Sequence, residues 1–242
     1  MGVALGWGPT EAAVLAKDAA CLVVVDVLSF TTSVGVAVEA GTSVLPYRRR
    51  DERAAAYATE RDAALAVGRS EATPETPWTL SPAALRAAPP TPRLVLPSPN
   101  GSTIAAGAGG ATVVAASLRN RTAVARWLAA HGYGSDSRPL AVIASGERWP
   151  DGSLRPALED LLGAGAVLSA LRGLGPYALT PEARAAATLW EATEDPVAEL
   201  HGCASGRELY EYGYPQDVAV AAEVDTSETV PVLRDGAFQE TP

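Results

Sequence analysis

The sequence of 242 residues has few of the side chains that define many enzyme classes. Lys17 is the only lysine, which argues against a Schiff-base mechanism or a phosphate-binding loop centred on lysine. The two histidines are too few for a histidine-rich metal centre or a phosphohistidine pair. The two cysteines, Cys21 and Cys203, lie far apart without metal-ligand spacing, so we expect a reduced, cytoplasmic protein.

Long apolar runs and a basic charge balance are also missing. No segment reaches the ~18–20 apolar residues that span a bilayer, and the first residues do not resemble a signal peptide, so we expect no membrane partner. The net charge of −9 argues against binding to nucleic acid, because nothing would offset phosphate repulsion. A small anionic substrate remains compatible with this charge if arginines, helix N-termini or a metal ion provide a local positive field.

Short apolar runs alternate with helical patterns along most of the chain. This alternation predicts one α/β domain, residues 1–242, with a mostly parallel or mixed central sheet. A homo-oligomer is compatible with the sequence. We expect strands at 22–25, 43–46, 94–96, 112–115 and 140–144, and helices at 29–40, 51–67, 122–131, 156–171, 181–193 and 207–212. Residues 69–92 read as a proline-rich loop with one helical turn, and 229–238 as a hairpin that closes or edges the sheet.

Polar residues follow four of the predicted strands. They are Asp26, Asn100, Ser117 and Glu147. If the strands are parallel, their carboxyl ends meet at one edge of the sheet, and these residues line one crevice. Helix N-termini at that edge suit a phosphate or a carboxylate. The alternative for the serine and asparagine is helix capping, which contributes ~1 kcal/mol of stability.

Four acids near these strand ends could hold a divalent cation. Asp26 follows a buried strand, where an ionised carboxylate needs a cation or several hydrogen-bond donors. Glu147, Glu159 and Asp160 are the other candidates. Mg²⁺ commonly uses one or two protein carboxylates together with water and substrate phosphate. Adjacent residues on a helix point about 100° apart, so Glu159 and Asp160 need not face the same ion. They could instead complement the helix dipole.

Two familiar phosphate-site designs do not fit. Asp26 is followed by Val27 and Leu28, so the Asp-x-Asp pair of haloacid-dehalogenase-like phosphatases is absent. Cys203 and Arg207 are separated by three residues, whereas the loop of tyrosine phosphatases requires five. We therefore expect Cys203 to be buried or to cap a helix.

Five segments, in order from about residue 20 to 238, resemble the 2-phosphosulfolactate phosphatase family. They are VVVDVL at 23–28, PNGST at 99–103, ASLRN at 116–120, Gly146-Glu147 with LEDLLGAGA at 158–166, and 201–217. The resemblance implies an α/β/α fold and Mg²⁺-dependent hydrolysis of the phosphate ester of sulfolactate, a step of coenzyme M synthesis. The residues that it implies in or near the site are Asp26, Asn100, Gly101, Ser102, Asn120, Glu147, Glu159 and Asp160.

The sequence departs from the family in two places. Ser29 stands where the family usually has an arginine, and the stretch before residue 93 is shortened and rich in proline. Both departures affect positions that we expect to contact the substrate. They leave two alternatives open: a phosphatase for another small phosphorylated hydroxy acid or sugar acid, and a metabolite-binding protein without catalysis.

Combining the two lines of reasoning, we predict a site for a small phosphorylated acid. Its catalytic acids are Asp26, Glu147, Glu159 and Asp160, and its Mg²⁺ ligands come from Asp26, Glu147 and Asp160. The groups expected to bind substrate are Asn100, Gly101, Ser102, Thr103, Ser117, Asn120, Ser145 and Gly146.

Overall fold

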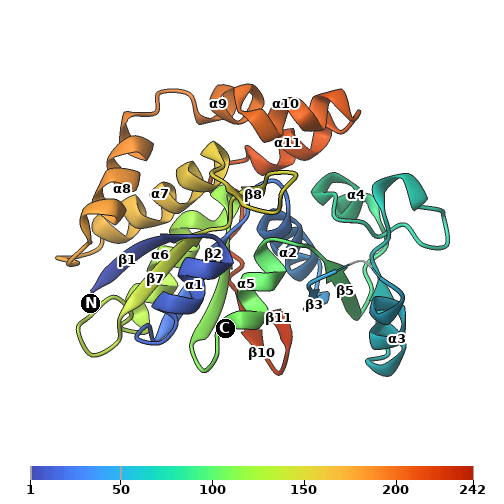
Figure 1. Ribbon diagram of the computed structural model, residues 1–242, viewed down its shortest axis with the longest axis horizontal. Helices are drawn as coiled ribbons and strands as arrows, with labels where there is room; N and C mark the ends of the chain where they lie inside the picture. The colour runs from blue at the N-terminus through green and yellow to red at the C-terminus, as the bar shows by residue number, and fades with distance from the viewer. Residues whose placement is uncertain (1, 50, 242) are drawn as a thin grey trace.

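A nine-stranded sheet forms the centre of the protein. The computed structural model describes residues 2–49 and 51–241 (Figure 1). The strand order is β1-β7-β2-β6-β10-β11-β3-β5-β4. The bounds are β1 Val3–Trp7, β2 Cys21–Val25, β3 Ser43–Tyr47, β4 Ala64–Leu65, β5 Arg93–Pro97, β6 Thr112–Ala116, β7 Leu140–Ala144, β10 Pro231–Arg234 and β11 Ala237–Glu240.

The C-terminal hairpin β10–β11 lies inside the sheet, between β6 and β3. The sequence correctly predicted a hairpin, but the expectation that it closes or edges the sheet is wrong. Three antiparallel pairings (β6–β10, β10–β11 and β11–β3) separate two parallel sets, so β3, β5 and β4 run opposite to β1, β7, β2 and β6. The strands that precede Asp26 and Asn100 therefore belong to opposite sets, and the expectation that they share one carboxyl edge is wrong.

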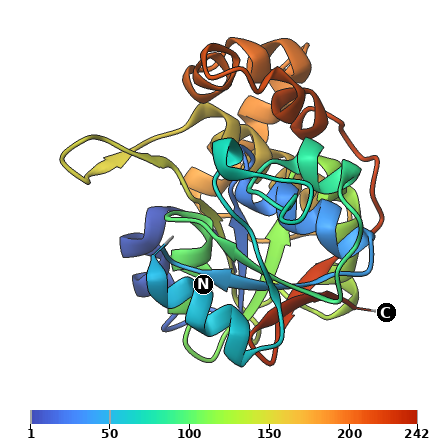
Figure 2. The same cartoon turned by 90° about the vertical axis from the view of Figure 1, so that its right-hand side faces the viewer.

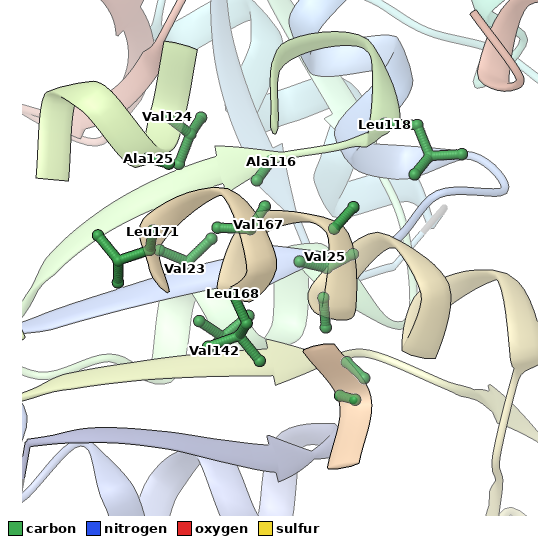
Figure 3. Packing of buried hydrophobic residues seen from close by; sticks show 14 of the residues in the cluster. Val23, Val25, Ala116, Leu118, Val124, Ala125, Val142, Val167, Leu168 and Leu171 are labelled. Atoms are coloured by element: carbon green, nitrogen blue, oxygen red, sulfur yellow. The ribbon is translucent and has the colours of Figure 1, made fainter. Parts of the chain in front are cut away.

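Helices cover both faces of the sheet, which confirms the three-layer α/β/α fold. Alternate residues of β2 enter different hydrophobic clusters: Val23 and Val25 pack with α6, α7 and α8, whereas Leu22 and Val24 pack with α1, α2 and α5. Figure 3 shows Val167, Leu168 and Leu171 of α7 above the first of these faces. The bounds are α1 Gly8–Leu15, α2 Phe30–Glu39, α5 Gly101–Gly107, α6 Arg121–Ala130, α7 Leu158–Arg172 and α8 Pro181–Ala192.

The expected helix over 51–67 is shorter in the structure. Helix α3 spans Glu52–Glu60, and Asp51 caps it by accepting hydrogen bonds from the N–H groups of Arg53 and Ala54. The chain then turns through Asp62, whose φ is +49°, and enters β4, so the predicted helix is wrong beyond Glu60. Helical propensity is overridden here by pairing of β4 with β5.

The proline-rich segment folds into two short helical pieces, η1 Arg69–Glu71 and α4 Pro82–Ala87. Ser81 caps α4 by accepting from the Ala84 N–H. Further along the chain, α9 Pro196–Gly202, α10 Ala204–Glu211 and α11 Pro215–Ala221 group at one end of the sheet (Figure 1). The two-stranded hairpin β8 Glu147–Arg148 and β9 Leu154–Arg155 projects from the body of the molecule (Figure 2). Helices α4 and α11 pack together, so distant parts of the sequence enclose this end.

None of the helices in residues 2–49 and 51–241 has the length and hydropathy needed to span a membrane.

Candidate active site

Asp26 lies directly after β2 and is buried, with 5% of its surface exposed. Its two carboxylate oxygens accept backbone hydrogen bonds from different elements: Oδ1 from Phe30 N at 3.1 Å and Oδ2 from Gly101 N at 2.9 Å. The first bond satisfies an N–H at the start of α2, so Asp26 also helps to cap that helix. The second bond joins the loop after β5 to the end of β2.

The backbone at Gly101 approaches Asp26 too closely for a larger residue. A Cβ atom at this position would lie 2.4 Å from Phe30 Cδ1 and 2.9 Å from Asp26 Oδ2. Both neighbours are themselves buried, so neither can move freely away. Glycine is therefore required here by space and not by a left-handed backbone.

We expect Gly101→Ala to displace Asp26 and to destabilise the protein by about 1–3 kcal/mol, the usual cost of overpacking. Urea denaturation measures the stability, and the same preparation measures phosphatase activity, which should fall at least about tenfold through misplacement of the carboxylate. Gly107→Ala, in the same helix, is the matched control because a Cβ there meets nothing within 4 Å. Equal stability of the two variants would contradict the packing argument.

Asn100, which precedes Gly101 in the chain, contacts the third predicted residue, Glu147. The Asn100 Nδ2 amide donates to Glu147 Oε2 at 2.9 Å. Asp26, Asn100 and Glu147 line one cleft of about 220 Å³ between the strand ends and α10. Asn100 and Glu147 also line a second hollow of about 150 Å³ at the β8–β9 hairpin. The structure thus brings together the three residues at the centre of the sequence prediction.

Asp160 lies behind this cleft and is buried near the start of α7. Its Oδ1 accepts from Val27 N at 2.7 Å, and its Oδ2 accepts from Gly146 N at 2.8 Å. One carboxylate therefore holds the loops that follow β2 and β7, and it fixes the backbone on either side of the cleft. This geometry gives Asp160 a positioning role.

We expect Asp160→Asn to destabilise the protein by roughly 1–3 kcal/mol, because the amide nitrogen would face a buried N–H and leave it without an acceptor. Thermal and urea denaturation check this. Asp136→Asn is the control, because Asp136 is exposed. If the two variants unfold at the same urea concentration, Asp160 does not fix these loops.

Glu159 and Cys203 meet on the other side of the acid cluster. Glu159 is 2% exposed and lies against the Cys203 thiol. Burial and the charge of Glu159 raise the pKa of Cys203 to about 12, so this thiol is not a nucleophile. Cys203 caps α10, its Sγ accepting from Gly206 N at 3.3 Å, which confirms the expectation of a buried or capping cysteine.

Burial, together with the charges of neighbouring acids, raises the pKa of three buried acids of the site. Burial raises the pKa of Asp26 to about 6, against the bonds from Phe30 and Gly101, and the Glu159 charge adds to the rise. Burial, followed by the charge of Asp26, raises the pKa of Glu147 to about 7. Burial and then the charges of Asp26 and Glu159 raise the pKa of Asp160 as well. Such a cluster favours the entry of a cation.

Most of the remaining predicted residues use their side chains or backbone N–H groups in hydrogen bonds that stabilise the local structure. Ser102 Oγ donates to the carbonyl oxygens of Tyr47 and Ser98, and Thr103 Oγ1 donates to that of Pro99. Asn120 accepts from Ser117 N at 2.9 Å and donates to Thr229 O at 3.0 Å. Ser117 and Asn120 do not line the cleft and fix the turn after β6. Gly146 lies with φ of +65° and donates its N–H to Asp160.

Ser145 is different, because its side chain has no partner. It is buried, its Oγ makes no hydrogen bond within the described part of the chain, and it lines the second hollow beside Asn100 and Glu147. A buried hydroxyl without a partner is costly, so this position favours a polar occupant such as a water molecule or a ligand oxygen.

Ser29, which the sequence had singled out at a substrate contact, lines the cleft, but sequence reasoning missed two other residues of its wall, Arg69 and Glu208. Arg69 Nη2 donates to Ser29 Oγ at 3.2 Å, and Arg69 Nε donates to Asp217 at 3.0 Å. The segment 201–217 was noted only as part of the resemblance, and Arg69 was placed in a loop. No local pattern links residues that lie 148 positions apart.

Comparison with known proteins identifies the family of the chain. The model of the family described as 2-phosphosulpholactate phosphatase matches residues 10–236. The chain belongs to the 2-phosphosulfolactate phosphatase family. It is similar to the probable 2-phosphosulfolactate phosphatases of Deinococcus radiodurans and Thermus thermophilus, each 33% identical over 218 residues, which cover 88% of this chain and 87% of the relative. The family is one of phosphoric monoester hydrolases, and the matched range contains every site residue that the sequence predicted.

Proposed function

We propose that this member of the 2-phosphosulfolactate phosphatase family is a Mg²⁺-dependent phosphatase that hydrolyses 2-phosphosulfolactate to sulfolactate and phosphate. The observation that carries the proposal is the pair of carboxylates, Asp26 and Glu147, that line one small cleft with the Asn100 amide. The family membership and the relatives' names support the substrate. The free thiols of Cys21 and Cys203 are consistent with the cytoplasmic location that is part of the proposal.

The donor set fits a magnesium ion held by few protein ligands. Within residues 2–49 and 51–241 no three His, Cys, Asp or Glu side chains form a ready metal cage. Mg²⁺ does not need one, because it usually takes one or two carboxylates and completes its shell with water and substrate oxygens. Asp26 and Glu147 are the proposed ligands, and the Ser145 Oγ, which has no partner among the described residues, suits a water molecule in the hollow beside Glu147. Asp160 does not line the cleft, whereas Asp26 and Glu147 do, so we reserve Asp160 for positioning the two loops that it holds.

A bound Mg²⁺ would neutralise the charge on the phosphoryl oxygens. The chain's own groups position the parts. Gly101 N–H and Phe30 N–H fix the Asp26 carboxylate, and the Asn100 amide fixes Glu147 Oε2 while leaving Oε1 free of partners among the described residues. Phosphoryl transfer depends mostly on such positioning and on charge stabilisation, so these groups can suffice.

Phosphate release from a panel of esters, assayed with and without Mg²⁺, tests the proposal. The panel contains 2-phosphosulfolactate, other phosphorylated hydroxy acids, phosphorylated sugar acids and a neutral phosphate ester. Release from 2-phosphosulfolactate that requires Mg²⁺ supports the proposal. Faster release from another phosphorylated acid supports the alternative substrate, and release from none of them supports a binding protein without catalysis.

A further inference from the structure

Arg69 begins the proline-rich segment and turns into the cleft wall, where its side chain is four-fifths buried. Its Nε donates to Asp217 Oδ2 at 3.0 Å, and its Nη2 donates to Ser29 Oγ and to the Leu80 carbonyl, both at 3.2 Å. The remaining nitrogen, Nη1, makes no hydrogen bond to the described residues. A guanidinium held in this way keeps two N–H donors available for a ligand.

The groups that hold Arg69 are themselves fixed. Asp217 is 1% exposed and accepts from Ser81 Oγ and from Ala83 N. The Arg69 guanidinium also lies over the Tyr214 ring, 5.2 Å from its centroid. Groups at the starts of α2, α4 and α11 therefore fix the arginine before any ligand arrives, and little conformational entropy remains to be lost on binding.

The charges around the cleft isolate Arg69 as its cationic point. The acids that line the cleft are Asp26, Glu147 and Glu208, and among the described residues of its lining Arg69 is the only basic one. Glu208 is already paired, because Arg155 contacts both of its oxygens at 2.8 and 3.0 Å. Asp26 and Glu147 thus suit a cation that binds the phosphate, and Arg69 suits a second anionic group of the same ligand. The volume of about 220 Å³ restricts the occupant to a small molecule.

We propose that Arg69 binds the acid group, a carboxylate or a sulfonate, that the substrate carries beside its phosphate ester, and that it thereby selects phosphorylated acids over neutral phosphate esters. The inference rests on the proposed function and adds the residue that determines its substrate class. The Arg69 Nη1 donates to the acid oxygens, while the Asp217 pair keeps the guanidinium in place. The side chain of Ser29 is short enough to leave room for the guanidinium, and its Oγ accepts the Nη2 bond.

The test compares kcat and KM for 2-phosphosulfolactate and for glycerol 2-phosphate, which has neutral hydroxymethyl groups in place of the carboxylate and the sulfomethyl group. Arg69→Gln should lower kcat/KM for the acid ester roughly 10- to 100-fold, mainly through KM, because one charge-assisted hydrogen bond is lost. The ratio of the two kcat/KM values should fall by the same factor. Equal losses on both esters would overturn the proposal, since they would indicate a structural role.

Two further variants keep the test decisive if Arg69→Gln folds poorly. Arg69→Gln combined with Asp217→Asn removes both members of the buried pair, so that no charge is left uncompensated. Arg69→Lys keeps the charge without the planar fork and should retain part of the preference for the acid ester. Arg126→Gln is the matched control, because Arg126 is 60% exposed and pairs only with Glu228 on the surface. Its preference should equal that of the wild type.

Titration calorimetry with sulfolactate separates this inference from the proposed function. Sulfolactate carries the acid but no phosphate, so its binding needs no catalysis. If the wild type hydrolyses no ester but binds sulfolactate more than about tenfold tighter than Arg69→Gln does, the proposed function fails and the acid subsite stands. If the wild type hydrolyses the esters and Arg69→Gln binds sulfolactate equally well, the subsite fails and the phosphatase stands.

Discussion

An Asp26→Asn variant is expected to fold and to lose at least about 1,000-fold of kcat with any phosphate ester that the wild type hydrolyses. The substitution keeps the shape of the side chain but removes the charge that would hold Mg²⁺ against the phosphate. The amide oxygen can still accept one of the two N–H groups, from Phe30 or from Gly101. Losing the other bond costs stability, but removing one negative charge beside Glu147 and Glu159 offsets part of that cost.

Three measurements support this prediction together: the phosphate release rate with Mg²⁺, the near-ultraviolet circular dichroism and the urea midpoint. We expect the near-ultraviolet circular dichroism spectrum to stay close to that of the wild type. The urea midpoint should correspond to a loss of stability of less than about 2 kcal/mol. Asp18→Asn serves as the control, because Asp18 is exposed, precedes β2 and does not line the cleft. Activity within a factor of three of the wild type would remove Asp26 from the mechanism.

The residue pattern predicted the central acids of the site for a reason that proved only partly correct. Asp26 and Glu147 follow β2 and β7, which are parallel neighbours, so a common edge does bring them together. Asn100 follows β5, which belongs to the opposite set of strands. Asn100 nevertheless lies at the site, because the chain bends after β5 and the N–H of the next residue, Gly101, donates to the Asp26 carboxylate. A single sequence carries no signal for the internal position of the β10–β11 hairpin, which reverses the strand direction.

Local signals were reliable where the interaction itself is local. Asp51 and Cys203 cap the helices that directly follow them, and the Asn120 side chain accepts from the Ser117 N–H three residues away. The same logic explains why Ser117 and Asn120 do not line the cleft: their polar atoms are used within their own turn. Arg69 could not be found in this way, because its partners Ser29 and Asp217 come from distant segments and meet only after packing.

Removing divalent cations with a chelator is expected to abolish turnover and to make stability depend on pH. Burial raises the pKa of Asp26 to about 6 and that of Glu147 to about 7, so both acids hold a proton more tightly in the folded chain than in the unfolded one. Their contribution is therefore fully present below pH of about 4 and is lost as the pH rises to about 7. Mg²⁺ binds the ionised forms and should restore that stability above pH 7.

Differential scanning calorimetry at pH 5 and pH 8, with and without Mg²⁺, measures the effect. At pH 8 we expect saturating Mg²⁺ to raise the Tm by on the order of 5 °C, and at pH 5 by much less, because protons then compete for the same carboxylates. Asp26→Asn should lose most of the Mg²⁺ response at pH 8, whereas the Asp18→Asn control should keep it. An equal Mg²⁺ shift in all three proteins would locate the ion elsewhere, and turnover that survives the chelator would show that the acids act without a metal.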